Sequence, residues 1–174
     1  LDRDGVLNPY IPDGYVKSPS EWQWQKNAIK ALQKLAQNDY RVIIITNQSC
    51  INRKMVSFQT VSAIHALIKS TLAEIGLKNI HFAICHHVSE DLCQCRKPKA
   101  EHIKKIIKTY QLSREDIIFI GDSPSDLQAG QNAGIKTIAL STGNEKMASY
   151  LLQTGLIFYE DLYTAINAIL PEIN

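Results

Sequence analysis

The stretch RVIIIT at residues 41–46 decides the fold, because its four central residues are all apolar and β-branched. A run of this kind predicts a strand that is buried on both faces. The stretch IIFI at residues 117–120 predicts a second buried strand. Between them, at residues 57–75, apolar residues recur every three or four positions, and that spacing predicts a helix.

The same two patterns alternate along the rest of the chain. We expect further strands at residues 80–85, 137–140 and 156–159, and further helices beginning near Lys26, after Pro98, and at residues 125–133 and 162–170. Alternating strands and helices predict a parallel sheet with helices on both faces and right-handed connections. The expected fold class is therefore α/β, with a doubly wound parallel sheet in three layers.

Size and charge restrict the possible partners. The chain has 174 residues, 45% of them hydrophobic, and we expect one domain over residues 1–174. A net charge of +2 is too small for a protein that coats nucleic acid or binds membranes through a basic surface. The aliphatic runs are far shorter than the roughly 20 residues that span a bilayer. We expect a monomer with no nucleic-acid or membrane partner.

Polar residues follow the expected strands at the points where they end. Asp2 and Asp4 lie two positions apart at the end of a strand that we expect to begin upstream of Leu1, so both side chains point to one side. Gly5 then allows a sharp turn, and Asp122 ends another strand. Ligands bind at the carboxyl ends of such strands, and three carboxylates there predict a Mg²⁺ site.

The loop at residues 85–95 predicts a second metal site. Its candidate ligands are Cys85, His87, Cys93 and Cys95. Three thiolates and one imidazole form a closed, four-coordinate set that is typical of structural zinc. His86 is a competing ligand, but the spacing of His87 from Cys85 favours His87. A disulfide framework belongs to short secreted chains, so we expect reduced thiols and a cytoplasmic location. Cys50 is expected to be a small core or loop residue.

Four motifs in order along the chain resemble those of the haloacid dehalogenase-like phosphatases. They are Asp2-Arg3-Asp4-Gly5-Val6-Leu7-Asn8, Thr46-Asn47-Gln48-Ser49, Arg96-Lys97-Pro98 and Gly121-Asp122. The match runs from Asp2 to Asp126. The resemblance implies a Rossmann-like fold of the haloacid dehalogenase type and a hydrolase that acts on phosphomonoesters.

The resemblance also implies a role for each motif. Asp2 would attack the phosphoryl group to form an aspartyl-phosphate, and Asp4 would protonate the leaving alcohol and then activate water. The Thr46 hydroxyl and the Lys97 ammonium would bind the remaining phosphoryl oxygens. Mg²⁺ would be held by Asp2, the backbone carbonyl of Asp4, and Asp122.

A zinc loop directly before Arg96 resembles that of the bacterial heptose-bisphosphate phosphatases and the histidinol-phosphatase domains. The resemblance implies a small enzyme without a large cap domain, with catalytic Mg²⁺ and structural Zn²⁺. By the same resemblance, the substrate-binding residues would be Asp13, Gly14, Tyr15, Thr46, Asn47, Gln48, Ser49, Arg96 and Lys97. The sequence departs from the family pattern at Cys50 and Lys54, which are usually Gly, and at Ser123, which is often basic.

These resemblances leave several substrates open. The length of the zinc loop is similar to the histidinol-phosphatase type, whereas residues 13–16 and 46–49 resemble the heptose type. The first expectation is removal of the 7-phosphate from D-glycero-D-manno-heptose 1,7-bisphosphate, in the synthesis of a lipopolysaccharide precursor. The alternatives are histidinol-phosphate hydrolysis, a nucleic-acid 3′-phosphatase and an inactive zinc-stabilised scaffold.

Four aromatic residues outside the motifs receive no role in catalysis. Trp22 and Trp24 alternate before the first helix and are expected to pack in the core. His65 and His102 lie on expected helices and are expected to face solvent.

Overall fold

The computed structural model describes residues 1–78 and 80–170. Its helices are α1 (Ala28–Gln37), α2 (Phe58–Glu74), α3 (Glu101–Tyr110), α4 (Pro124–Ala133), α5 (Glu145–Thr154) and α6 (Leu162–Ile169). Its strands are β1 (Ile43–Asn47), β2 (His81–Cys85), β3 (Ile118–Gly121), β4 (Lys136–Leu140) and β5 (Phe158–Tyr159). Three short 3-10 helices are η1 (Pro19–Glu21), η2 (Ser89–Asp91) and η3 (Arg114–Asp116).

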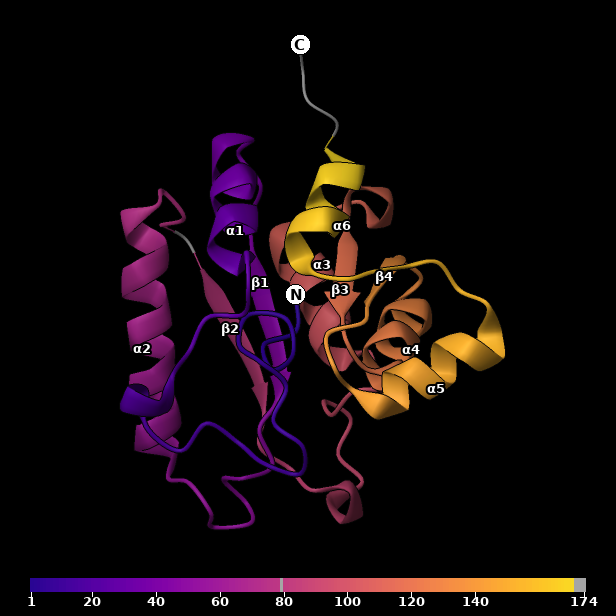
Figure 1. Ribbon diagram of the computed structural model, residues 1–174. Helices are drawn as coiled ribbons and strands as arrows, with labels where there is room; N and C mark the ends of the chain where they lie inside the picture. The colour runs from indigo at the N-terminus through magenta and orange to yellow at the C-terminus, as the bar shows by residue number, and fades with distance from the viewer. Residues whose placement is uncertain (79, 171–174) are drawn as a thin grey trace.

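Residues 1–2 join two halves of one parallel sheet. β1 pairs with β2, and β4 lies between β3 and β5. The Leu1 nitrogen donates to the Ile43 carbonyl at 2.8 Å, and the Leu1 carbonyl accepts from the Ile45 N–H at 2.8 Å. On the other side, the Asp2 N–H donates to the Ile120 carbonyl at 3.0 Å. This short segment therefore lies between β1 and β3, where Figure 1 marks the N-terminus.

The strand order places a switch point beside Asp2. Across the sheet the order is β2, β1, residues 1–2, β3, β4 and β5. The chain builds outward on one side as far as β2 and then returns to the other side at β3. Ligands in doubly wound folds bind at the carboxyl ends of the strands near such a point.

Helices cover both faces of the sheet and make three layers (Figure 1). Residues of α1, α2 and α6 pack with Ile44 and Ile120 in the main core. On the opposite face, α3 and α4 pack with Ile45 and Phe119, and α5 packs over Ala139. Ile44 and Ile45 face different layers because successive side chains of a strand alternate. The predicted fold class is confirmed.

One helix, α5, is absent from the expected elements. The Asn144 side chain caps it by accepting from the N–H groups of Lys146 and Met147, at 3.1 and 3.4 Å. It ends at Gly155, whose φ of 64° is left-handed. Only Met147 and Leu151 of this helix are buried. The caps are recognisable in the sequence, but two buried residues give a weak periodic signal.

The two histidines differ from their expected solvent-facing positions. His65 is 5% exposed and lies on the buried face of α2, beside Ile64 and Ile68. His102 on α3 is half-buried. A polar residue type suggested exposure, but His65 has a buried partner from a distant part of the chain, described below. Trp22 and Trp24 pack against the main core as predicted.

Candidate active site and metal centre

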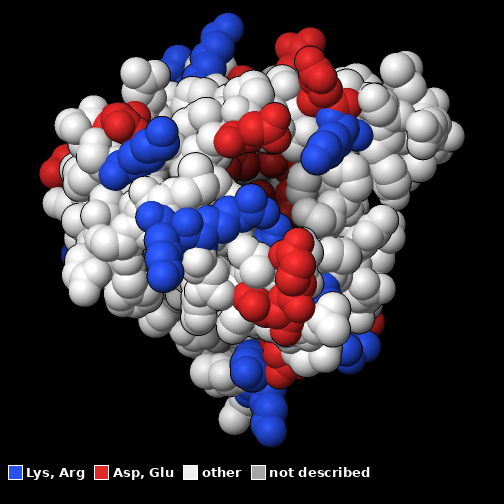
Figure 2. Space-filling model, turned by 90° about the horizontal axis from the view of Figure 1, so that it is seen from below, with Lys and Arg blue, Asp and Glu red and all other residues white. Residues whose placement is uncertain are grey.

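The acidic and basic motif residues meet at the carboxyl ends of the strands. Asp2 is the last residue of the segment between β1 and β3, Asp122 follows β3, and Lys97 lies on the loop between β2 and α3. All three are buried. Figure 2 shows this edge of the sheet face on. Its surface is hollowed near the middle, with acidic side chains inside the hollow and both basic and acidic ones around it.

Lys97 is a buried cation held between two carboxylates. Its Nζ lies 2.7 Å from Asp2 Oδ1 and 2.6 Å from Asp126 Oδ1, and it donates to the Ile45 carbonyl at 3.0 Å. Burial alone would lower the pKa of Lys97, but the carboxylates of Asp126 and Asp2 outweigh burial and raise it. The Asn47 side chain holds the backbone of Lys97 through two hydrogen bonds, at 3.1 and 3.2 Å.

Asp2, Asp122 and Asp126 form a cluster of buried carboxylates. One oxygen from each lies within 4.8 Å of the others. Burial, with the neighbouring carboxylates, raises the pKa of Asp122 to about 8 and that of Asp2 to about 7. Within residues 1–78 and 80–170, the buried Asp122 Oδ2 has no hydrogen-bond partner. Excess negative charge and an unpartnered oxygen fit a divalent cation such as Mg²⁺.

Gly5 makes room for Asp122. Its φ is +82°, and a Cβ atom at this position would collide with the Asp122 carboxylate. The N–H groups of Val6 and Leu7 donate to the Arg3 carbonyl at 3.2 and 2.8 Å and close the turn. The expected turn at Gly5 is present, and the close approach to Asp122 is a second reason for glycine.

The Asp4 carboxylate lies apart from this cluster. It accepts from Arg3 Nη2 at 2.7 Å, from Asn8 Nδ2 at 3.1 Å and from Gln48 Nε2 at 2.7 Å. Burial alone would raise the pKa of Asp4, but the Arg3 guanidinium and these hydrogen bonds outweigh burial and lower it. Of the predicted Mg²⁺ ligands, Asp2 and Asp122 are brought together, and the carbonyl of Asp4 stays a prediction.

Asp126 and Arg3 are site residues to which the sequence analysis gave no role. Asp126 is fully buried, and its Oδ2 accepts from the N–H and the hydroxyl of Ser123 at 3.0 and 2.6 Å. Because Asp126 is fixed in this way, its other oxygen can hold Lys97. An acidic residue four positions after Asp122, in the first turn of α4, was the available signal. Arg3 offered no such signal, since only the fold shows it buried.

The predicted substrate-binding residues divide into two groups. Gln48 is 0% exposed and donates to the Thr46 hydroxyl at 2.8 Å as well as to Asp4. It therefore holds these two side chains from inside the protein. Tyr15 Oη lies 2.9 Å from the hydroxyl of Ser49, which ties two predicted substrate loops together.

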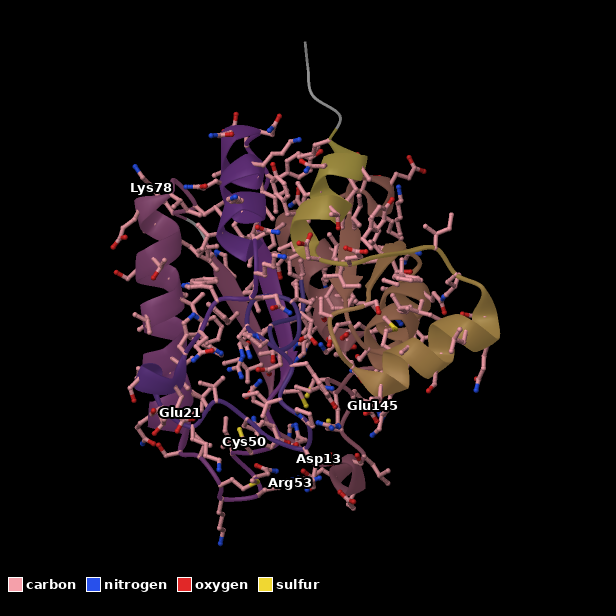
Figure 3. The ribbon with its side chains drawn as sticks, viewed as in Figure 1. Asp13, Glu21, Cys50, Arg53, Lys78 and Glu145 are labelled. Carbon is pink, nitrogen blue, oxygen red and sulfur yellow. The ribbon has the colours of Figure 1, made fainter. Side chains whose placement is uncertain are left out.

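The beginning of the loop that carries Tyr15 is more open. Asp13 is exposed, and Gly14 is half-buried. Figure 3 shows Asp13 and Arg53 at the edge of the molecule where the loops gather, with Lys78 at the opposite end.

The four predicted zinc ligands lie together. Cys85 Sγ is 3.7 Å from both Cys93 Sγ and His87 Nδ1, and Cys95 Sγ is 3.6 Å from Cys93 Sγ and 3.4 Å from His87 Nδ1. In a tetrahedral zinc site, S···S edges are about 3.8 Å and S···N edges about 3.6 Å, given the usual bond lengths. These residues therefore fit zinc, and the imidazole in the cluster is that of His87, as favoured.

Charge supports the same conclusion for the zinc loop. Burial raises the pKa of Cys85 to about 12, so a cation is needed to hold this sulfur as a thiolate. Arg96 Nη1 donates to the His87 carbonyl at 3.1 Å, and Lys99 Nζ donates to the Cys93 carbonyl at 2.6 Å. These two bonds connect the loop of candidate zinc ligands to the segment that carries Lys97.

Comparisons with known proteins agree with this geometry. Residues 15–140 match the family model of haloacid dehalogenase-like hydrolases. Proteins from Pseudomonas putida (35% identity, 91% of each chain covered) and Bordetella bronchiseptica (35% identity, 99% of this chain and 97% of the relative) are similar. Both are named D-glycero-beta-D-manno-heptose-1,7-bisphosphate 7-phosphatase.

Solved structures give the same result. The D,D-heptose 1,7-bisphosphate phosphatase from B. bronchiseptica, complexed with magnesium and phosphate, superposes with a TM-score of 0.87 at 34% identity. The match covers 97% of this chain and 95% of that one. A second structure of this kind, from Burkholderia thailandensis, has a TM-score of 0.71 at 28% identity and covers 99% and 97%. The predicted resemblance is confirmed, and the chain belongs to the haloacid dehalogenase-like hydrolase family.

Proposed function

We propose that this chain is a Mg²⁺-dependent phosphatase that removes the 7-phosphate of D-glycero-D-manno-heptose 1,7-bisphosphate. The observation that carries the proposal is the pairing of buried Asp2 with Lys97 beside Asp122, at the carboxyl ends of the central strands. The names of the full-length relatives support this substrate over histidinol phosphate.

Asp2 is the proposed nucleophile. Lys97 and the backbone N–H of Arg3 both engage Oδ1, each at 2.7 Å, which leaves Oδ2 for attack. Oδ2 forms a bond to phosphorus while the bond between phosphorus and the sugar oxygen breaks, and an aspartyl-phosphate results. Water then attacks phosphorus, the bond to Oδ2 breaks, and inorganic phosphate leaves.

Asp4 is the proposed acid and base. It gives its proton to the departing sugar oxygen and takes a proton from the attacking water, so the cycle returns it to its first state. Its hydrogen bonds favour the carboxylate that the second step needs. For the first step, the negative charge of the arriving phosphoryl group would raise its pKa and favour protonation.

Lys97 and Thr46 are the proposed ligands of the remaining phosphoryl oxygens. Asn47 positions Lys97 through its backbone. Mg²⁺, held by Asp2, the Asp4 carbonyl and Asp122, would supply positive charge that neutralises the phosphoryl oxygens.

Substrate selection is proposed for the outer part of the site. Arg96 offers a planar guanidinium that can bind an oxyanion at two points, which suits the second phosphate of a bisphosphate. The loop of Asp13, Gly14 and Tyr15 would contact sugar hydroxyls, and the contact from Tyr15 to Ser49 holds this loop beside the site. The zinc loop is proposed to be structural, since its four ligands leave no open position.

Two further predictions concern the molecule as a whole. Among the residues that the structure describes, no helix combines the length and the hydropathy that a membrane span requires. Separately, we propose a cytoplasmic location because all four cysteines are free thiols, and we propose that the enzyme is a monomer. Gel filtration combined with light scattering tests the oligomeric state directly.

A side-by-side assay of phosphate release tests the proposed function. The substrates are the heptose bisphosphate, histidinol phosphate and a 3′-phosphorylated oligonucleotide, each with and without Mg²⁺, and the Asp2→Asn protein serves as the blank. We expect the highest kcat/KM for the heptose bisphosphate and no turnover without Mg²⁺. A preference of about tenfold or more for histidinol phosphate, about 1.4 kcal/mol in transition-state stabilisation, contradicts the proposed substrate.

A further inference from the structure

Arg3 stands between Asp2 and Asp4 in the sequence of the first motif, and its side chain is fully buried. Its Nη2 donates to both oxygens of Asp4, at 2.7 and 2.9 Å, and its Nε donates to Asp4 Oδ1 at 3.3 Å. The other end of the guanidinium, Nη1, lies 3.2 Å from His65 Nε2. The fork therefore connects the carboxylate to a residue from the middle of α2.

The chemistry of this contact fixes the state of His65. An Arg nitrogen is always a donor, so Nε2 of His65 must accept, and the imidazole must be neutral with its proton on Nδ1. Burial and the Arg3 charge lower the pKa of His65 to about 3, which agrees with a neutral ring. The ring also stacks on Phe82 of β2, with centroids 4.0 Å apart and planes 12° apart. The acceptor thus has a fixed position.

We propose that His65 is a positioning residue for the acid–base step. Its neutral imidazole holds the Arg3 guanidinium in the orientation that fixes the Asp4 carboxylate. Without the His65 nitrogen, Arg3 Nη1 would be a buried charged donor with no hydrogen-bond partner among the described residues. The guanidinium would then turn to reach another acceptor. The inference rests on the proposed role of Asp4, and it extends that role to a residue of α2 that does not itself touch the substrate.

Two substitutions separate the acceptor from the packing. His65→Phe keeps a ring that can stack on Phe82 but removes the acceptor nitrogen, and His65→Gln restores an acceptor oxygen. Kinetics are measured on the heptose bisphosphate and on p-nitrophenyl phosphate, whose leaving group needs little protonation.

We expect His65→Phe to lower kcat on the bisphosphate about tenfold or more, with KM within about twofold, because a misplaced acid affects only the chemical step. Loss on p-nitrophenyl phosphate should stay below about threefold, and His65→Gln should regain most of the activity. Equal losses on both substrates, or no loss on the bisphosphate, overturn the proposal.

Asp4→Asn, assayed on the same two substrates, separates the positioning role of His65 from the acid role of Asp4. If the loss of activity depends on the leaving group in Asp4→Asn but not in His65→Phe, the positioning role of His65 is wrong and the acid role of Asp4 stands. If Asp4→Asn itself shows no dependence, both are wrong. Dependence in both variants supports both roles.

A measurement on the unsubstituted protein decides the matter even if His65→Phe does not fold. The ¹⁵N chemical shifts of the imidazole nitrogens report which one carries the proton. We expect the Nδ1–H tautomer of His65, unchanged from about pH 6 to about pH 8, since only that form can accept from Arg3. A proton on Nε2 overturns the proposal.

Discussion

The carboxylate cluster and the zinc loop are both groups of side chains that could hold a metal ion, but they are organised in opposite ways. In the zinc loop, three sulfur atoms and one nitrogen atom lie at the corners of a tetrahedron, and the distances between them are those of its edges. In the carboxylate cluster, Asp2 and Asp126 share Lys97, and an oxygen of Asp122 has no partner among the described residues. The first arrangement is closed and the second is incomplete.

This difference matches the work proposed for each site. A closed set of four ligands leaves a metal no position for substrate, so such a metal can only hold the chain in place. An incomplete set keeps its oxygens available and can exchange a cation and a phosphoryl group. The chain thus places the proposed zinc site directly before the segment that carries Lys97 into the carboxylate cluster.

The sharpest separation of the two clusters is the Asp2→Asn substitution. Loss of the nucleophile should lower kcat by about 10³-fold or more, while zinc content and melting temperature stay close to those of the original protein. Phosphate release, metal analysis and thermal unfolding measure the three quantities. Asp116→Asn removes an exposed carboxylate from η3 and is the matched control. Activity within about tenfold of the original protein excludes Asp2 as the nucleophile.

Arg96 links the two clusters, and its substitution tests which one it serves. Arg96→Ala should raise KM for the bisphosphate by about 10- to 150-fold, equivalent to about 1.5–3 kcal/mol for a charge-assisted hydrogen bond. Zinc content should not change, although the bond to the His87 carbonyl is lost. Arg96→Lys keeps the charge without the planar fork and should recover only part of the affinity. Unchanged KM for the bisphosphate argues against a role in substrate binding.

Cys95→Ser tests whether the zinc loop is structural. We expect zinc content to fall from about one ion per chain, and the melting temperature to fall by about 4–8 °C for a loss of about 2 kcal/mol. Activity should also fall, because Arg96, a proposed substrate-binding residue, directly follows Cys95. Cys50→Ser changes a buried cysteine outside the cluster and should keep its zinc. A zinc-free Cys95→Ser protein with full stability and activity is incompatible with this role.

The pH dependence of Mg²⁺ binding should be steep at the carboxylate cluster. Asp122 and Asp2 have pKa values raised to about 8 and about 7, so protons compete with the cation as pH falls below about 8. The apparent dissociation constant for Mg²⁺ should rise by up to about tenfold per pH unit for each proton displaced. Calorimetric titration with Mg²⁺ from about pH 8.5 to about pH 6 measures this constant, since Asp122 and Asp2 both change charge within that range. Affinity independent of pH contradicts the raised pKa values.

The fold could be predicted from the sequence because apolar runs and polar residues at strand ends are local signals. The strand at residues 41–46, the motif residue Asp122 and the ligands of the zinc loop could all be placed from spacing alone. The partnership of Arg3 with His65 could not, because it joins residues 62 positions apart and depends on the packing of α2 against the sheet. Asp126 was missed for a related reason, since its importance lies in a contact with Lys97.

The position of residues 1–2 between the two half-sheets has a mechanical consequence. The backbone hydrogen bonds of Leu1 reach β1, and that of Asp2 reaches β3, so the proposed nucleophile follows the seam of the molecule. A shift of β1 relative to β3 therefore changes the position of Asp2 relative to at least one of its two neighbours. Hydrogen exchange at the Asp2 amide reports the loss of its bond to β3, and we expect that opening to stop catalysis because it moves the proposed nucleophile.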